Sequence, residues 1–104
     1  MATATTFDVL AEPMRRRILD LLLDGESSVG DLVKRLRLSQ PGVSKHLRVL
    51  RDAGLVSVRS EAQRRIYGVR PEPLEEIAEW LEPYRKLWAE RLDALERHLD
   101  EEAS

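Results

Sequence analysis

One short stretch of this chain carries polar and cationic side chains whose chemistry suits nucleic-acid bases and phosphates. These side chains are Gln40, Ser44, Lys45, Arg48 and Arg51. A glutamine amide can bind adenine through two hydrogen bonds, a serine hydroxyl can bind several base edges, and lysine or arginine can bind guanine or phosphate. We predict that the first three lie near base edges and that the two arginines lie near backbone phosphates. The alternative interpretation is an ordinary solvated helix face.

The neighbouring residues predict the helix that must hold these side chains. Ser39 is a good N-cap, because its hydroxyl can accept a hydrogen bond from a free backbone N–H of the first turn. Pro41 fits the first turn, where a missing N–H costs little, and it can also touch a thymine methyl group. Both residues therefore join the candidate DNA-binding set. A buried stripe at helical spacing and a terminating glycine complete the pattern: Val43, Leu47, Leu50 and Gly54.

Shorter helical patterns precede this helix. A short helix over residues 6–11 comes before a second helix, which begins at Pro13 and ends before Gly25. Ser28 is the expected N-cap of a third helix, and Arg37 begins the turn that leads to Ser39. Two successive short helices joined by a tight turn form a helix-turn-helix.

Two runs rich in β-branched and aromatic residues follow, and they predict a β-hairpin. The strands are expected over Leu55–Arg59 and Arg64–Val69, joined by a short polar link. Gln63, Arg64 and Arg65 would then lie near the tip, where arginines can enter a minor groove or follow its phosphates. Because side chains alternate along a strand, one of the two arginines should point back along the sheet. The pattern leaves open which of them contacts DNA.

This order of elements, with residues 39–56 as SQPGVSKHLRVLRDAGLV, closely resembles the ArsR-type winged helix-turn-helix repressors. The segments LAEPMRRRIL and RRIY resemble the same family, so the resemblance extends from about Phe7 to about Leu99. It implies a mainly α fold with a β-hairpin wing, in a single winged helix-turn-helix domain over residues 1–104. It also implies a homodimeric transcriptional repressor whose partner is a pseudo-palindromic operator on double-stranded DNA.

The last third of the chain predicts the surface that joins two copies. Pro71 and Pro73 precede a helical pattern, and Pro83 inside this pattern should kink the helix or end it. We expect residues 7–70 to form the DNA-binding core and wing, and residues 71–102 to form dimerisation helices. Apolar and aromatic residues at helical spacing, together with the first helix, supply the candidate interface: Phe7, Leu10, Leu81, Tyr84, Trp88, Leu92, Leu95 and Leu99.

The charge distribution agrees with this division. The net charge is −2, yet residues 14–70 hold 13 Lys/Arg against 6 Asp/Glu, whereas residues 71–104 hold 4 against 11. A basic middle beside an acidic tail predicts a local phosphate-binding surface next to a region with another role. The chain has neither a long apolar run nor an N-terminal signal pattern, so no membrane partner is expected and the cytoplasm is the default location.

The sequence predicts no metal site and no cofactor. It contains no cysteine, and where arsenic or cadmium sensors of the resembling family carry two cysteines, this chain has Ser28 and Gly30. Neither replaces a soft sulfur ligand. Zinc needs about four N, O or S ligands, and His46 and His98 lie far apart in the sequence. The inducer therefore stays unidentified.

Other functions find less support in the residues. No phosphate-binding loop or nucleophile motif indicates an enzyme. A winged-helix protein–protein adaptor without an operator remains an alternative. So does a small-molecule-responsive repressor with an aromatic pocket around Trp80, Tyr84 and Trp88.

Two further features of the sequence, a run of three arginines and a histidine, lead to expectations about contacts within the fold. Arg15, Arg16 and Arg17 occupy the first turn of the second helix, where cations oppose the helix dipole. We expect carboxylates of the C-terminal helices to pair with most of them, with phosphate as the alternative. His46 borders the predicted core stripe, and we expect it to be structural.

Overall fold

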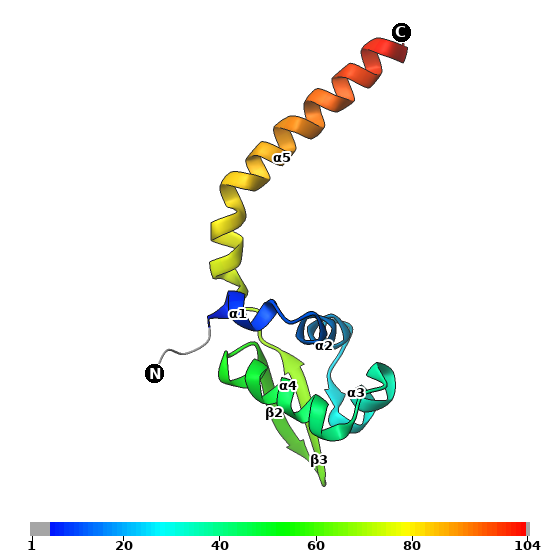
Figure 1. The fold of residues 1–104 in the computed structure, drawn as a ribbon, viewed down its shortest axis with the longest axis vertical. Helices are drawn as coiled ribbons and strands as arrows, with labels where there is room; N and C mark the ends of the chain where they lie inside the picture. The colour runs from blue at the N-terminus through cyan, green and yellow to red at the C-terminus, as the bar shows by residue number, and fades with distance from the viewer. Residues whose placement is uncertain (1–4, 104) are drawn as a thin grey trace.

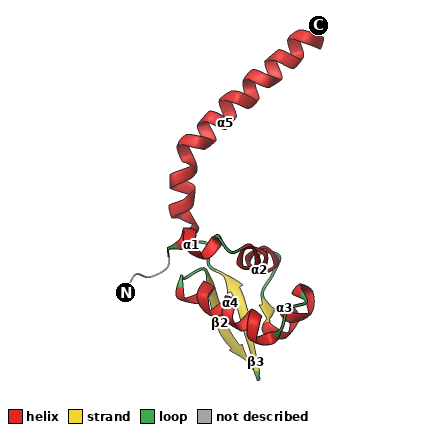
Figure 2. Cartoon of the chain, viewed as in Figure 1, coloured by secondary structure: helices red, strands yellow, loops and turns green. Residues whose placement is uncertain are grey.

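Five helices and a three-stranded sheet make up residues 5–103, the part of the chain that the computed structural model describes (Figure 1). A compact head contains α1 to β3, and one long helix, α5, extends from it (Figure 2). The predicted fold, mainly α with a β-hairpin wing, is confirmed. In chain order the elements are α1 (Thr6–Leu10), α2 (Pro13–Leu23), β1 (Ser27–Ser28), α3 (Val29–Leu36), α4 (Gln40–Asp52), β2 (Val56–Glu61), β3 (Arg64–Val69) and α5 (Leu74–Ala103).

Hydroxyl side chains begin the two helices of the helix-turn-helix, as the sequence predicts. The Ser28 hydroxyl accepts a hydrogen bond from the Asp31 backbone N–H at 3.2 Å, at the start of α3. The Ser39 hydroxyl accepts one from the Gly42 N–H at 3.2 Å, at the start of α4. Between them Arg37 adopts a left-handed backbone with φ of 57°, which reverses the chain direction. These local bonds fix where α4 begins relative to α3.

The sheet has the order β1-β3-β2 and is antiparallel throughout. The β2–β3 hairpin pairs Val56 with Val69 at its base and Glu61 with Arg64 at its tip. The polar link expected over residues 60–63 is longer than the link observed, because cross-strand pairing extends β2 through Glu61. Strand β1, which pairs Ser27 with Tyr67, was not predicted. Two serines carry no strand signal of their own, and their pairing depends on β3 far along the chain.

A single apolar cluster holds α4 against α2, α3 and the sheet. The stripe predicted on α4 is confirmed, since Val43, Leu47 and Leu50 are all 0% exposed. Ile18 of α2 and Leu32 of α3 are buried in the same cluster. Removing one such side chain, as in Leu47→Ala, costs roughly 2–5 kcal/mol of folding free energy. Packing of its buried side against α2, α3 and the sheet therefore fixes the orientation of the polar side of α4.

Helix α5 is one continuous helix with Pro83 inside it, so of the two expected outcomes the kink is the one found. Figure 1 shows α5 changing direction partway along its length. Proline has no N–H to donate to the preceding turn, and this is a standard cause of a bend. Before the bend, the Trp80 ring meets Phe7 of α1 edge-on, with ring centroids 5.8 Å apart. None of the helices in residues 5–103 combines the length and apolar character needed to cross a membrane.

Candidate nucleic-acid interface

Helix α4 presents its candidate DNA-binding residues on the side away from the core. Its cap geometry depends on Gly42, because a Cβ at that position would lie 3.1 Å from the Ser39 hydroxyl oxygen. The candidates on this segment are all exposed: Ser39, Gln40, Pro41, Ser44, Lys45, Arg48 and Arg51. The helix can therefore approach a large ligand without unfolding or repacking.

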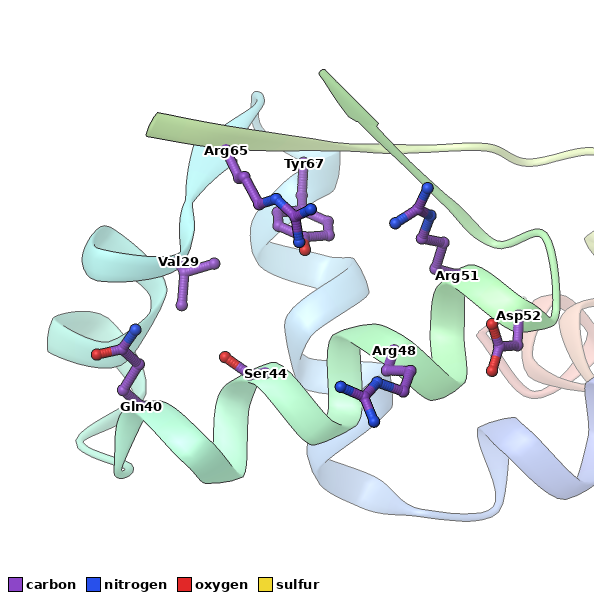
Figure 3. Close-up of a pocket in the computed structure, with 8 residues that line it drawn as sticks. All are labelled: Val29, Gln40, Ser44, Arg48, Arg51, Asp52, Arg65 and Tyr67. Atoms are coloured by element: carbon purple, nitrogen blue, oxygen red, sulfur yellow. The ribbon is translucent and has the colours of Figure 1, made fainter. Parts of the chain in front are cut away.

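A cleft between α4 and β3 gathers several of these candidates (Figure 3). Its volume is about 470 Å³. From β3, Arg65 and Tyr67 project toward α4, and Arg51 projects from α4 toward the sheet (Figure 3). The complete lining is Val29, Gln40, Ser44, Arg48, Arg51, Asp52, Arg65 and Tyr67. An amide, two hydroxyls and three guanidinium groups thus converge on one concave surface.

A second cavity adjoins the first at the wing. It has a volume of about 340 Å³ and shares Val29, Gln40 and Arg65 with the cleft. Gln63 and Arg64 line only this second cavity. The wing candidates therefore lie beside the α4 candidates, whereas Pro41 and Lys45 lie outside both linings.

The two wing arginines have different surroundings. Arg64 lies 3.4 Å from a carboxylate oxygen of Asp31, at the start of α3. Arg65 faces the cleft, and within residues 5–103 no carboxylate lies within ion-pair distance of it. Alternation along β3 explains the difference, because Arg65 and Tyr67 share one face of the strand. The sequence analysis did not include Tyr67 among the candidates, although its position two residues after Arg65 in an expected strand predicts that the two share one face.

A third arginine ties the wing to the loop before β1. Arg59 on β2 donates hydrogen bonds to Glu26 at 3.2 Å and to Glu61 at 2.7 Å. These bonds, led by the one to Glu26, raise the pKa of the Arg59 guanidinium above its ordinary value. Arg59 therefore acts within the wing, and its charge is largely matched by its own neighbours.

The expected carboxylate partners of the α2 arginines are not the ones found. Arg15 donates to the backbone carbonyl of Val9 at 3.2 Å, and Arg16 donates to that of Leu10 at 2.7 Å. The last carbonyls of a helix have no partner within the helix and carry its negative dipole end, so they attract cations. The expectation of carboxylates from the C-terminal helices was wrong for these two, because α1 lies nearer.

The two histidines lie in separate environments. His46 is half-buried on α4, as expected for a residue bordering the core, and its Nδ1 is buried without a hydrogen-bond partner. His98 is exposed on α5, 3.0 Å from Glu102. In the part of the chain that the structure describes, no three His, Asp or Glu side chains gather as a metal site would require.

The candidate dimer residues form an exposed apolar stripe along α5. Tyr84, Trp88, Leu92, Leu95 and Leu99 are 46–65% exposed. Of the remaining candidates, Phe7 is exposed, while Leu10 and Leu81 are half-buried. Trp80 is 56% exposed and lies against Tyr84 with ring centroids 5.1 Å apart. The aromatic residues therefore lie on the surface of the helix and do not enclose a pocket by themselves.

A helix-turn-helix with a hairpin wing and a basic concave face defines the class of winged helix-turn-helix DNA-binding proteins. The family model described as "Bacterial regulatory protein, arsR family" matches residues 12–58. The chain belongs to this family and is a DNA-binding transcriptional regulator. Residues 12–58 run from the start of α2 into β2, so the match includes the whole helix-turn-helix.

Individual relatives agree over a longer part of the chain. The HTH-type transcriptional regulator Rv2034 of Mycobacterium tuberculosis is 34% identical, over 92% of this chain and 87% of the relative. The transcriptional repressor SdpR of Bacillus subtilis is 32% identical, over 72% and 83%. The crystal structure of the ArsR-family regulator RHA00566 has a TM-score of 0.68 at 30% identity, over 80% of this chain and 86% of that one.

Proposed function

We propose that this chain is a homodimeric transcriptional repressor that binds a pseudo-palindromic operator. One observation carries the proposal: the cleft between α4 and β3 brings Gln40, Ser44, Arg51 and Arg65 onto one exposed face. Amide and hydroxyl groups can recognise base edges, while guanidinium groups suit phosphates. In this arrangement α4 enters a major groove and the wing follows the adjacent backbone.

Each side chain has a proposed task. Gln40 and Ser44 lie one helical turn apart near the start of α4, where a recognition helix contacts bases. Arg48 and Arg51 follow along the helix and bind phosphates on one side of the groove. Arg65 binds the phosphate ridge between α4 and the wing. Lys45, Pro41, Ser39, Gln63 and Arg64 complete the proposed contact surface.

A homodimer follows from the size of this surface and from the stripe on α5. A single recognition helix contacts too few base pairs to select one site in a genome, and two-fold dimers solve this with half-sites about 34–36 Å apart. An apolar stripe left exposed on so small a protein favours association. We assign DNA binding to residues 7–70 and dimerisation to residues 71–102. Because its partner is genomic DNA, the protein acts in the cytoplasm.

We also propose that the inducing signal is not a metal ion. Ser28, which occupies the position of a cysteine in arsenic and cadmium sensors, caps α3 and pairs with Ile66 in the sheet. Its hydroxyl is therefore occupied by a structural bond to the Asp31 N–H. A hydroxyl is also a poor ligand for the soft ions that those sensors bind.

Base-contact variants test the DNA-binding proposal. An operator is first selected from a genomic fragment pool. Gln40→Ala or Ser44→Ala should then lose roughly 1–3 kcal/mol of binding free energy and relax sequence choice at one position of each half-site. Arg48→Ala is the matched control: it should weaken binding to all sequences about equally. If no sequence is selected at all, the adaptor alternative gains support. If the Gln40 and Ser44 variants keep full affinity and selectivity, the assigned base-contacting face is wrong.

A further inference from the structure

The Tyr67 side chain connects the apolar core to the cleft between α4 and β3. It is 7% exposed and belongs to the same apolar cluster as Leu47. It also lines the cleft, where the ring projects from β3 toward α4 and ends in the hydroxyl (Figure 3). Strand β3 is the central strand of the sheet, and Tyr67 pairs with Ser27 on one side and with Val58 on the other. The hydroxyl is therefore fixed in position before any ligand binds.

The Tyr67 hydroxyl has no hydrogen-bond partner within the part of the chain that the structure describes. Buried tyrosine hydroxyls usually have a partner, because removing a polar group from water without one costs free energy. A phenylalanine could pack its ring in the core in the same way and would avoid that cost. The partner of this hydroxyl must then come from outside the protein, through the cleft.

The charges of the cleft lining indicate what kind of partner fits. Arg48, Arg51 and Arg65 supply three positive charges, and Asp52 supplies one negative charge. Within residues 5–103, none of these three arginines lies within ion-pair distance of a carboxylate, Asp52 included. Guanidinium groups and a tyrosine hydroxyl can all donate hydrogen bonds. A group with several anionic oxygens, such as a phosphate, therefore matches both the charge and the donors of the cleft.

The position of Tyr67 indicates the source of this phosphate. Arg65 and Tyr67 share one face of β3, and both project toward α4 (Figure 3). In the proposed function α4 enters a major groove and the wing follows the adjacent backbone, so a DNA strand crosses the cleft between them. We propose that the Tyr67 hydroxyl donates a hydrogen bond to the same backbone phosphate that Arg65 binds. This inference rests on the DNA binding of the proposed function.

Affinity and salt dependence together distinguish this neutral contact from a charged one. Tyr67→Phe should weaken operator binding at least about 10-fold, because a hydrogen bond to a charged group is lost in each copy. The slope of log affinity against log salt should not change, since a neutral hydroxyl displaces no counterion, whereas Arg65→Ala should lower that slope. Ser57→Ala is the matched control. Ser57 pairs with Gly68, so its hydroxyl lies on the opposite face of the sheet from Tyr67 and outside both cavities. This control should bind the operator as the wild type does.

Operators that carry a single methylphosphonate in each half-site identify the phosphate involved. This group replaces one charged phosphate oxygen with a methyl group, and both stereoisomers are tested at each phosphate in turn. At one position the wild type and Tyr67→Phe should bind within about 2-fold of each other, because the oxygen that accepts from Tyr67 is already missing. The same methylphosphonate should also reduce the effect of Arg65→Ala, because the two side chains share that phosphate.

The outcomes separate this contact from DNA binding itself. Full operator affinity in Tyr67→Phe would overturn the phosphate contact and leave the proposed function standing. So would a loss of affinity that persists with every methylphosphonate, since the hydroxyl would then contact a base or a sugar. If the wild type selects no operator, the proposed function is wrong and the contact with it. Tyr67→Phe keeps the ring in the core, so its melting temperature should equal that of the wild type. A clear decrease would mean that the hydroxyl has a partner within the fold and would also count against the proposal.

Discussion

Replacing Arg65 with alanine should lower the salt dependence of operator binding. Arg65 lines the cleft with Arg48 and Arg51, whereas Arg64 lies 3.4 Å from Asp31. We therefore predict that Arg65 is the wing arginine that binds phosphate. Each phosphate contact contributes about 0.9 to the slope of log affinity against log salt. A dimer loses one contact per copy, so the slope should fall by about 1.8.

That change in slope is large enough to measure. Raising salt fourfold, from about 50 to about 200 mM, should weaken wild-type binding about 12-fold more than it weakens Arg65→Ala. The assay is fluorescence anisotropy of a labelled operator across this salt range. Arg65→Lys should keep most of the slope, because the charge remains even though the planar guanidinium is lost.

The matched control is Arg64→Ala. It should change the slope much less, because the Arg64 charge is already balanced by the neighbouring Asp31 carboxylate. The reasoning fails if Arg64→Ala flattens the salt dependence by about 1.8 while Arg65→Ala leaves it unchanged. That result would mean that the wing rotates or releases Asp31 on binding DNA.

Three further predictions follow from the fold and the interface. Zinc, cadmium, cobalt or arsenite titrated into the protein–operator complex should not release the DNA, and stoichiometric release by one ion, reversed by a chelator, would contradict this. Replacing both Leu92 and Leu95 with Glu should place like charges face to face between two copies, giving monomers in sedimentation and much weaker operator binding although every DNA-contacting residue is intact. Ser39→Ala removes the α4 N-cap and should cost about 1 kcal/mol of unfolding free energy in denaturant titrations, with Ser60→Ala as a near-neutral surface control.

Local signals in the sequence predicted the helix-turn-helix well. Ser28 and Ser39 are N-caps, and caps act within three residues, so a short window contains all the necessary information. The apolar spacing of Val43, Leu47 and Leu50 identified the buried side of α4 for the same reason. The residues of α4 outside this buried stripe then had to lie on its exposed side, and they include the candidate base contacts.

Short sequence windows of this kind could not predict the contacts that depend on tertiary packing. Strand β1 exists because Ser27 pairs with Tyr67, and neither residue type alone predicts that pairing. Arg16 donates to the Leu10 carbonyl only six residues away, but that contact depends on how α1 packs beside α2. Alternation predicted that one wing arginine would differ from the other, but only the position of Asp31 relative to β3 distinguishes Arg64 from Arg65.

The bend at Pro83 bears on how far apart two operator half-sites must lie. The helix continues for about 30 Å beyond Pro83, at 1.5 Å per residue through Ala103. A change of about 10° at the bend would therefore displace the far end by about 5 Å, which exceeds the rise of about 3.4 Å between successive base pairs. In the proposed dimer the two α5 helices join the two heads, so the bend angle affects the distance between the heads. The bend angle at Pro83 would then help to set the distance between the two operator half-sites, although α5 itself does not contact DNA.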